Sequence, residues 1–297
     1  MKNDIDQKEF LINRVKKISD RNTTSKFRGW VYNFYKIIYY KSLMFLNKTS
    51  EIKVKTFWDG KINIILPESV SINIWRNGFA ESDVSIYLLK YLNKGETFID
   101  IGAHFGFYSL LASSIVGREG QVLSFEPTTS TFNQLSKNIV NQGNENIKIF
   151  NLAAFNSKTE MEFNDYGIIN SAFNSFFANR GDNKLAGERI KVNTIVLDDF
   201  LSENYSDRKI SMIKLDAESS EFQIITGLKN TINTHHPKII LEIGDHSISG
   251  IKSSHELVEL IESFGYEGFE LNKSNFQIVP FTIGKKESYR NILFIPV

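Results

Sequence analysis

The feature that most constrains the fold is a regular alternation of short apolar runs with longer amphipathic ones, which begins near residue 83. Apolar runs predict strands at residues 97–101, 121–125, 147–153, 210–215, 238–243 and 291–297. Amphipathic runs between them predict helices at residues 107–116, 128–141, 219–228 and 253–264. Strands that alternate with helices build a parallel sheet with helices on both faces. The sequence therefore predicts an α/β fold with a doubly wound, Rossmann-like sheet.

Two further regions lie outside this alternation. Before it, helical patterns occur at residues 5–19 and 27–46, and short strand patterns occur at residues 61–66 and 71–75. Within it, residues 156–200 contain two β-like runs around a loop rich in Phe, Asn and Gly, and we expect this insertion to lie over the top of the sheet. We therefore expect a helical extension over residues 1–60 and one main domain over residues 61–297.

The composition excludes several classes of protein. The chain of 297 residues has 35 Lys and Arg residues against 34 Asp and Glu residues. No global basic excess is present to drive nucleic-acid binding, and we expect no nucleic-acid partner. The chain contains no Cys, which excludes disulfides, thiolate metal sites and Cys nucleophiles. The absence of Cys, together with first residues that do not resemble a secretory signal, fits a cytoplasmic protein.

The strand predicted at residues 97–101 runs into a turn that suits a small ligand. Asp100 lies near the end of the strand, and Gly102 and Gly106 follow it. Glycines permit a tight turn and a close approach of a ligand to the backbone, and the N-terminus of the next helix offers free N–H groups. A strand, a glycine turn and a helix also recur as a purely structural feature. This turn therefore indicates a ligand site only together with the residues at the end of the next strand.

The strand predicted at residues 121–125 is followed by Glu126, whose carboxylate can accept hydrogen bonds from both hydroxyls of a ribose. An NAD-dependent oxidoreductase would share this pattern and stays open as an alternative. Its G-x-G-x-x-G pattern, however, has Gly where this chain has His104. Asp100 also suits a ligand with an ammonium group, such as the methionine moiety of S-adenosylmethionine, and would repel a pyrophosphate.

Charged residues gather at the ends of two later strands. The period of two along a strand places Lys214, Asp216 and Glu218 on one face. Glu242, Asp245 and His246 end the next strand and are expected at the same edge of the sheet. Three interpretations stay open here, namely an acid–base set, a site for a hard cation and a polar rim without chemistry.

The order and spacing of these motifs resemble the FkbM-type methyltransferases, a family of S-adenosylmethionine-dependent enzymes. The matching segments within residues 78–297 are 96–103, 107–109, 125–127, 132–138, 151–153, 197–200, 214–218, 237–242 and 291–294. The resemblance implies a class I methyltransferase fold, with a mostly parallel seven-stranded sheet whose last strand is antiparallel. It also implies S-adenosylmethionine as the cofactor and a hydroxyl on a sugar, glycan or related small metabolite as the methyl acceptor.

The resemblance also implies roles for individual residues. Those implied at the cofactor are Glu81, Asp100, Gly102, Ala103, His104, Gly106, Ser109, Glu126, Pro127, Ala153 and Asp216. Those implied in catalysis are Asp216, Lys214, Glu218 and His104, with Asp216 or His104 as the base that takes the hydroxyl proton. No metal ion is expected, and residues 151–154 are expected beside the adenine.

The chain departs from the family pattern at two places. His104 stands where the family usually has Asn, and Ser219-Ser220 stands where it usually has Gly-Ala. If the backbone at the second place requires a positive φ, serine is less favourable there than glycine. That departure keeps open a further alternative, a non-catalytic scaffold protein that binds the cofactor without turnover.

Residues 27–46 contain eight aromatic side chains, interrupted by Lys36 and Lys41. The lysines divide the run into pieces too short to cross a bilayer. Eight aromatic side chains are nevertheless too costly to leave in water. We expect residues 1–50 to form helices that pack on the main domain or on a second copy of the chain in a homodimer. The alternative is a peripheral contact with the inner face of a membrane.

Overall fold

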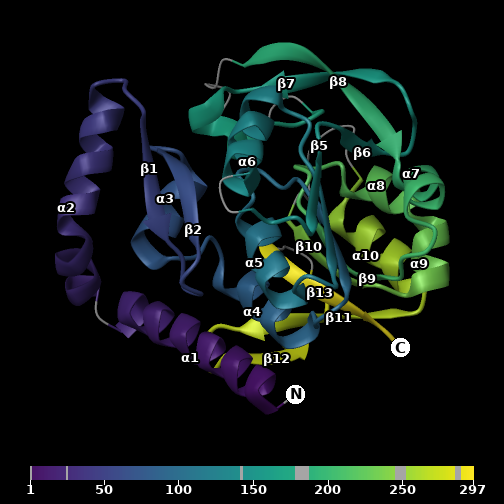
Figure 1. Cartoon of the computed structure of the whole chain (residues 1–297), viewed down its shortest axis with the longest axis horizontal. Helices are drawn as coiled ribbons and strands as arrows, with labels where there is room; N and C mark the ends of the chain where they lie inside the picture. The colour runs from purple at the N-terminus through teal and green to yellow at the C-terminus, as the bar shows by residue number, and fades with distance from the viewer. Residues whose placement is uncertain (1, 25, 141–142, 178–186, 245–251, 285–288) are drawn as a thin grey trace.

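The computed structural model describes residues 2–24, 26–140, 143–177, 187–244, 252–284 and 289–297. Within these residues, eight strands form one sheet in the order β12-β11-β13-β10-β9-β3-β4-β5 (Figure 1). In chain order they are β3 (Thr97–Ile101), β4 (Gln121–Phe125), β5 (Ile147–Phe150), β9 (Ile210–Leu215), β10 (Lys238–Ile243), β11 (Tyr266–Asn272), β12 (Gln277–Pro280) and β13 (Arg290–Pro296).

The doubly wound, mostly parallel sheet that the sequence predicts is confirmed. Strands β3, β4, β5, β9 and β10 are parallel neighbours, and β13 lies antiparallel between β10 and β11. The expected count of seven strands is wrong for the described chain, because β12 pairs with β11 as an additional antiparallel edge strand. The antiparallel closing strand is confirmed.

Helices cover both faces of this sheet (Figure 1). One face carries α4 (Ser82–Tyr91), α5 (Phe107–Val116) and α6 (Thr129–Val140), and the other carries α7 (Leu197–Asn204), α8 (Glu221–Thr226), α9 (Lys229–His235) and α10 (Ser254–Glu262). Alternate residues of a strand point to opposite faces. Accordingly, Phe98 packs in the first layer, whereas Ile99 and Ile101 pack in the second. The helix expected at residues 219–228 corresponds to the shorter α8, and α9, which follows it, was not predicted.

A second, three-stranded sheet contains β6 (Ala153–Phe155), β8 (Glu188–Val196) and β7 (Glu160–Asp165). The single strand expected at residues 147–153 is wrong, since β5 pairs with β4 in the main sheet and β6 pairs with β8 in the second. Asn151 explains the break. Its side-chain amide donates to the carbonyl oxygens of Glu126 and Pro127, at 2.9 and 2.8 Å, and so turns the chain out of the main sheet.

The short strand expected at residues 71–75 is also wrong, because these residues belong to helix α3 (Ser69–Asn77). Their alternating Ser-Ile-Asn-Ile-Trp sequence imitates a strand, but the buried Glu68 carboxylate accepts hydrogen bonds from the N–H groups of Val70 and Ser71, at 2.8 and 2.6 Å. Such a cap satisfies N–H groups that have no partner inside the helix. The preceding hairpin is β1 (Ser50–Lys55), which was not predicted, and β2 (Lys61–Leu66), which was.

The N-terminal segment forms the two expected helices, α1 (Lys2–Thr24) and α2 (Lys26–Phe45). Helix α1 lies along α4 and buries Val15 completely, and the Lys8 ammonium donates to the Leu92 carbonyl oxygen at 2.6 Å. Among the described residues, no helix has the length and apolar character needed to cross a bilayer.

We predict that Glu68→Ala lowers the free energy of unfolding by about 2 kcal/mol, because two buried N–H groups of α3 lose their acceptor. Urea denaturation measures this change. The matched control is Glu145→Ala, which removes an exposed side chain and should change stability by less than about 0.5 kcal/mol. Equal stability of the two variants would contradict the capping role.

Candidate active site

A cavity of about 260 Å³ lies where β3, β4 and β9 end. The turn after β3, the residues after β4 and the chain leaving β9 all contribute to its wall. Ten of the predicted site residues line it: Glu81, Gly102, Ala103, His104, Glu126, Pro127, Ala153, Lys214, Asp216 and Glu218. Of residues 151–154, the last three also line it. Parallel strands deliver their carboxyl ends to one edge, which is why segments distant in the sequence meet here.

Gly102 lets two strand ends come close together. Its φ is +74°, and a Cβ atom built there would lie 1.8 Å from the backbone oxygen of Asp216. No side chain fits in that space. The gap between the turn after β3 and the chain after β9 is therefore filled by backbone, and Asp216 donates its N–H to the Ile101 carbonyl oxygen at 3.1 Å.

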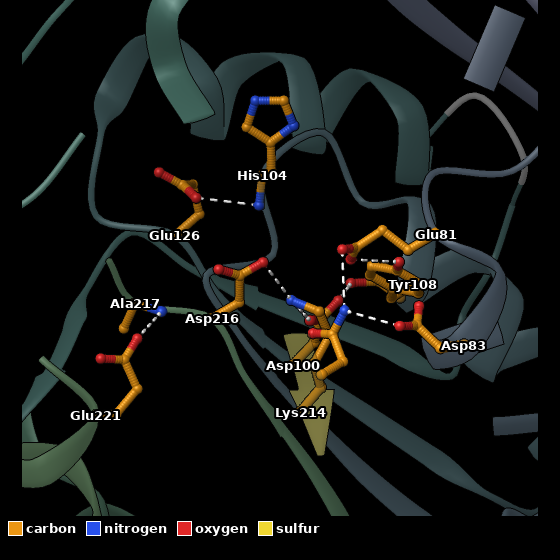
Figure 2. Close-up of polar contacts among 12 residues, drawn as sticks. Glu81, Asp83, Asp100, His104, Tyr108, Glu126, Lys214, Asp216, Ala217 and Glu221 are labelled. Atoms are coloured by element: carbon orange, nitrogen blue, oxygen red, sulfur yellow. Dashed lines mark hydrogen bonds and ion pairs between the residues drawn. The ribbon is translucent and has the colours of Figure 1, made fainter. Parts of the chain in front are cut away.

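Glu126 lies deep in the cavity wall, with 7% of its surface exposed. One carboxylate oxygen accepts a hydrogen bond from the N–H of His104 at 3.0 Å (Figure 2). The other accepts a hydrogen bond from the N–H of Thr128 at 3.1 Å. Burial raises the pKa of Glu126 to about 7, although these N–H donors oppose the shift. Each oxygen keeps a second lone pair for a ligand hydroxyl.

Lys214 is the buried cation of the site, with 3% of its side chain exposed. Its ammonium group lies 3.1 Å from Asp216 Oδ2 and 3.9 Å from Asp100 Oδ1 (Figure 2). Lys214 and Asp100 are paired residues in the register of β9 and β3, so the sheet itself brings them together. Burial alone lowers the pKa of Lys214, but the carboxylates of Asp216, Asp100 and Glu81 outweigh burial and raise it.

Asp100, Gly106 and Ser109 are predicted site residues that the structure places behind the cavity wall. Asp100 is completely buried, and its Oδ2 atom accepts the Ser109 hydroxyl at 2.6 Å. Its Oδ1 atom has no hydrogen-bond partner within the described residues. Burial raises the pKa of Asp100, which the Lys214 charge partly offsets. Gly106, with a φ of +88°, starts α5 and packs against Leu135.

Sequence reasoning missed two groups that bind Glu81. The Glu81 carboxylate accepts a hydrogen bond from the Tyr108 hydroxyl at 3.0 Å (Figure 2). It also accepts one from the Asn291 side-chain amide at 2.9 Å. Burial raises the pKa of Glu81, and the nearby Asp83 and Asp216 carboxylates raise it further. The signal for Asn291 was the predicted antiparallel closing strand, because such a strand starts at the edge where the parallel strands end.

The remaining predicted residues are Glu242, which also lines the cavity, and His104, Asp245 and His246. The half-buried His104 ring stacks on Phe105 with centroids 3.9 Å apart, and its Nε2 atom lies 2.7 Å from the Ser171 hydroxyl. Figure 2 shows this ring turned away from Lys214 and Asp216, and burial lowers its pKa. Asp245 and His246 lie outside the described residues. Within the described part of the chain, no group of three or more His, Asp or Glu side chains could hold a metal ion.

Residues 100–267, more than half of the chain, match the family model described as the methyltransferase FkbM domain. The chain belongs to the FkbM methyltransferase family. No curated protein matches it in sequence.

Solved structures that are similar to this chain include several methyltransferases. An FkbM methyltransferase from Methylobacillus flagellatus KT has 13% identity and a TM-score of 0.42, with 77% of this chain covered but only 56% of the Methylobacillus chain. A SAM-dependent O-methyltransferase from Thermotoga maritima has 12% identity and a TM-score of 0.38, with 83% of this chain and 77% of that chain covered. Fibrillarin from Aeropyrum pernix, with natively bound S-adenosyl-L-methionine, has 10% identity and a TM-score of 0.37, with 69% of this chain and 67% of the fibrillarin chain covered.

Ser219 is the position at which this FkbM-family chain departs from the usual glycine. Its φ is +81°, in the left-handed region that favours glycine, and the residue is 2% exposed. A side chain in this region costs about 1–2 kcal/mol. The departure is therefore a strained one, and it lies in the turn that follows Asp216 and Glu218.

We predict that Ser219→Gly is more stable than Ser219→Ala by about 1 kcal/mol, because both variants lose the hydroxyl but only Gly relieves the strain. Chemical denaturation of the two variants gives the difference. Ser202, an exposed residue inside α7, is the matched control, since Gly there should be less stable than Ala by about 0.5–1 kcal/mol. An Ala variant at residue 219 as stable as the Gly variant would show that no strain is stored there.

Proposed function

We propose that the chain transfers the methyl group of S-adenosylmethionine to a hydroxyl on a sugar, glycan or related small metabolite. The observation that carries the proposal is the charge of the cavity. Three carboxylates, those of Glu81 and Asp216 in the cavity wall and of Asp100 behind it, surround the buried ammonium group of Lys214. This excess of negative charge complements a ligand that carries cationic groups, as the donor does.

The residues of the cavity fit the parts of this donor. Glu126 offers both carboxylate oxygens to the two ribose hydroxyls, and the backbone around Gly102 leaves no side chain in the way. Leu152, Ala153 and Ala154 supply an apolar surface beside the adenine. The negative charge of the buried Asp100 carboxylate, behind the cavity wall, favours a ligand with an ammonium group over a pyrophosphate, which argues against an NAD-dependent oxidoreductase.

The acceptor would lie against the charged side of the cavity. When bound, the donor supplies an electrophilic methyl group on a sulfonium, so orientation of the acceptor contributes much of the rate. Asp216, whose side chain is 38% exposed, is placed to accept the hydroxyl proton, and Lys214 holds its carboxylate in position. Glu218 lines the same side and can accept hydrogen bonds from further hydroxyls. His104 is the second candidate base, with its ring bonded to Ser171.

An assay with methyl-labelled S-adenosylmethionine tests the activity. The purified protein is incubated with pools of monosaccharides, oligosaccharides and hydroxylated metabolites, and mass spectrometry identifies products that have gained one methyl group. Product from a hydroxylated acceptor is the expected result. Binding of S-adenosylhomocysteine without product from any pool would instead favour a non-catalytic scaffold protein.

We predict that Asp216→Asn lowers turnover by about 10²–10⁴-fold, the usual contribution of a positioned base. The affinity for S-adenosylhomocysteine should stay within a few-fold, because the carboxamide keeps the shape of the side chain. The matched control is Asp199→Asn, an exposed carboxylate on α7, which should leave turnover unchanged. Unchanged turnover in Asp216→Asn would place the base elsewhere.

We predict that the affinity for S-adenosylhomocysteine falls about tenfold from pH 8 to pH 6, as the pH drops through the Glu126 pKa of about 7. The direction follows because the ionised carboxylate accepts both ribose hydroxyls, whereas the protonated form has lost part of that capacity. Glu126→Ala should weaken binding at pH 8 by about 1.5–3 kcal/mol and flatten the pH profile.

Isothermal titration calorimetry at both pH values measures these affinities. The control variant is Glu203→Ala, which removes an exposed glutamate from α7 and should keep the wild-type affinity and pH profile. A Glu126→Ala variant with wild-type affinity and pH dependence would remove Glu126 from the donor site.

A further inference from the structure

Exposed apolar side chains are concentrated on and just after helix α2. Of the thirteen large hydrophobic side chains that are exposed in the described chain, seven lie between residues 34 and 46. They are Phe34, Tyr35, Ile38, Tyr39, Met44, Phe45 and Leu46, and Phe45 is 89% exposed. Apolar side chains gathered in this way mark an interaction site on a folded protein.

The helix has an inner face and an outer face. Asn33 and Leu43 are buried on the inner side, toward the rest of the molecule. Phe34, Ile38, Lys41 and Phe45 follow the spacing of a single helical stripe and are all exposed; together they are named the outer face of α2. Figure 1 shows α2 at the edge of the molecule, beside α3 and β1 and away from the main sheet.

Contacts with α3 hold α2 in this orientation. Tyr35 and Tyr39 pack edge-on against Trp75, with ring centroids 6.2 and 5.7 Å away, and the Lys36 ammonium donates to the Trp75 carbonyl oxygen at 2.5 Å. These contacts engage one flank of the helix, whereas Ile38, Lys41 and Phe45 of the outer face stay exposed. Helix α3 also lines the cavity, through Val70, Asn73 and Ile74. Helix α3 therefore contacts both α2 and the candidate active site.

Charge identifies the partner of the outer face. Residues 26–50 contain five basic residues and no acidic one, whereas the described helix α1 mixes both signs. Lys41 lies on the outer face and Lys48 follows it, and both are exposed. A second copy docked through this face by twofold symmetry would bring cation against cation. An anionic lipid surface complements the cations and also accepts the aromatic and aliphatic side chains.

We propose that the outer face of α2 docks the protein on the surface of a bilayer that contains anionic lipids. Phe45 and Ile38 enter the interface between headgroups and acyl chains, while Lys41 and Lys48 reach the lipid phosphates. The protein lies on the bilayer and does not cross it. This proposal is independent of methyl transfer, and a measurement of binding alone decides it.

The test is co-sedimentation of the full chain with vesicles of phosphatidylcholine alone and of phosphatidylcholine with about one quarter phosphatidylglycerol. We expect binding to the anionic vesicles, weaker binding in high salt and much weaker binding to the neutral vesicles. Ile38→Glu/Phe45→Glu should reduce binding to the anionic vesicles by about tenfold or more. The matched control is Val140→Glu, which places the same charge at another exposed apolar residue, 74% exposed on α6, and should bind like the wild type.

Size-exclusion chromatography and thermal unfolding of all variants show whether they remain folded. Three results would overturn the proposal. The first is the absence of binding to either vesicle, and the second is equal loss of binding in Val140→Glu and Ile38→Glu/Phe45→Glu. The third is a dimer that dissociates in Ile38→Glu/Phe45→Glu while vesicle binding persists, which would assign the outer face to a second copy of the chain.

Discussion

The ammonium group of Lys214 lies almost without solvent at the edge of the main sheet, and its charge has to be compensated inside the protein. The register of β3 and β9 sets Asp100 beside it, and the end of β9 supplies Asp216. Removal of the Asp100 or the Asp216 carboxylate would leave the buried positive charge of Lys214 with less negative charge beside it. The ion pairs that compensate the Lys214 charge thus also fix the Asp216 carboxylate in the cavity wall.

Other elements are tied to the same cluster. The Ser109 hydroxyl links Asp100 to α5, and the Ser124 hydroxyl, which donates to Ser109 at 2.8 Å, extends the link to β4. On the other side, Glu81 joins the start of α4 to Asn291 at the start of β13. Because burial raises the pKa values of Glu81 and Asp100, the cluster holds its protons more tightly than isolated carboxylates would. A cationic ligand would stabilise the ionised form of these carboxylates, which is the physical basis of the proposed donor site.

The sequence predicted the parts of the fold whose pattern is local. The bounds of β3, β4, β9, β10 and α5 follow from apolar runs and the turns between them, and the structure confirms them. Residues 71–75 were misassigned because their alternation of polar and apolar residues suits a strand, whereas the Glu68 cap and burial of Ile74 make a helix. Strand β11 and the edge strand β12 were missed, since their pairing with β13 and with each other joins segments that carry no strong periodic signal.

The candidate site, too, could be predicted from the sequence only in part. Residues at strand ends, such as Gly102, Glu126 and Asp216, could be found because topology brings those ends to one edge. The roles of Tyr108 and Asn291 were not assigned, because they depend on how side chains of α5 and β13 pack against Glu81 at the start of α4. Asp100 was expected in contact with the ligand, but the structure places it one layer deeper, where it acts through Lys214 and Ser109. Burial of this kind depends on packing and leaves no pattern in the sequence.

A crystal structure of the full chain with S-adenosylhomocysteine tests directly whether the donor binds at the ends of β3, β4 and β9. We expect the ribose hydroxyls within hydrogen-bond distance of the Glu126 carboxylate, about 2.5–3.0 Å, the methionine moiety over the Gly102 turn and the sulfur facing Asp216. The ligand at another site, or in this cavity with its ribose away from Glu126, would contradict this expectation.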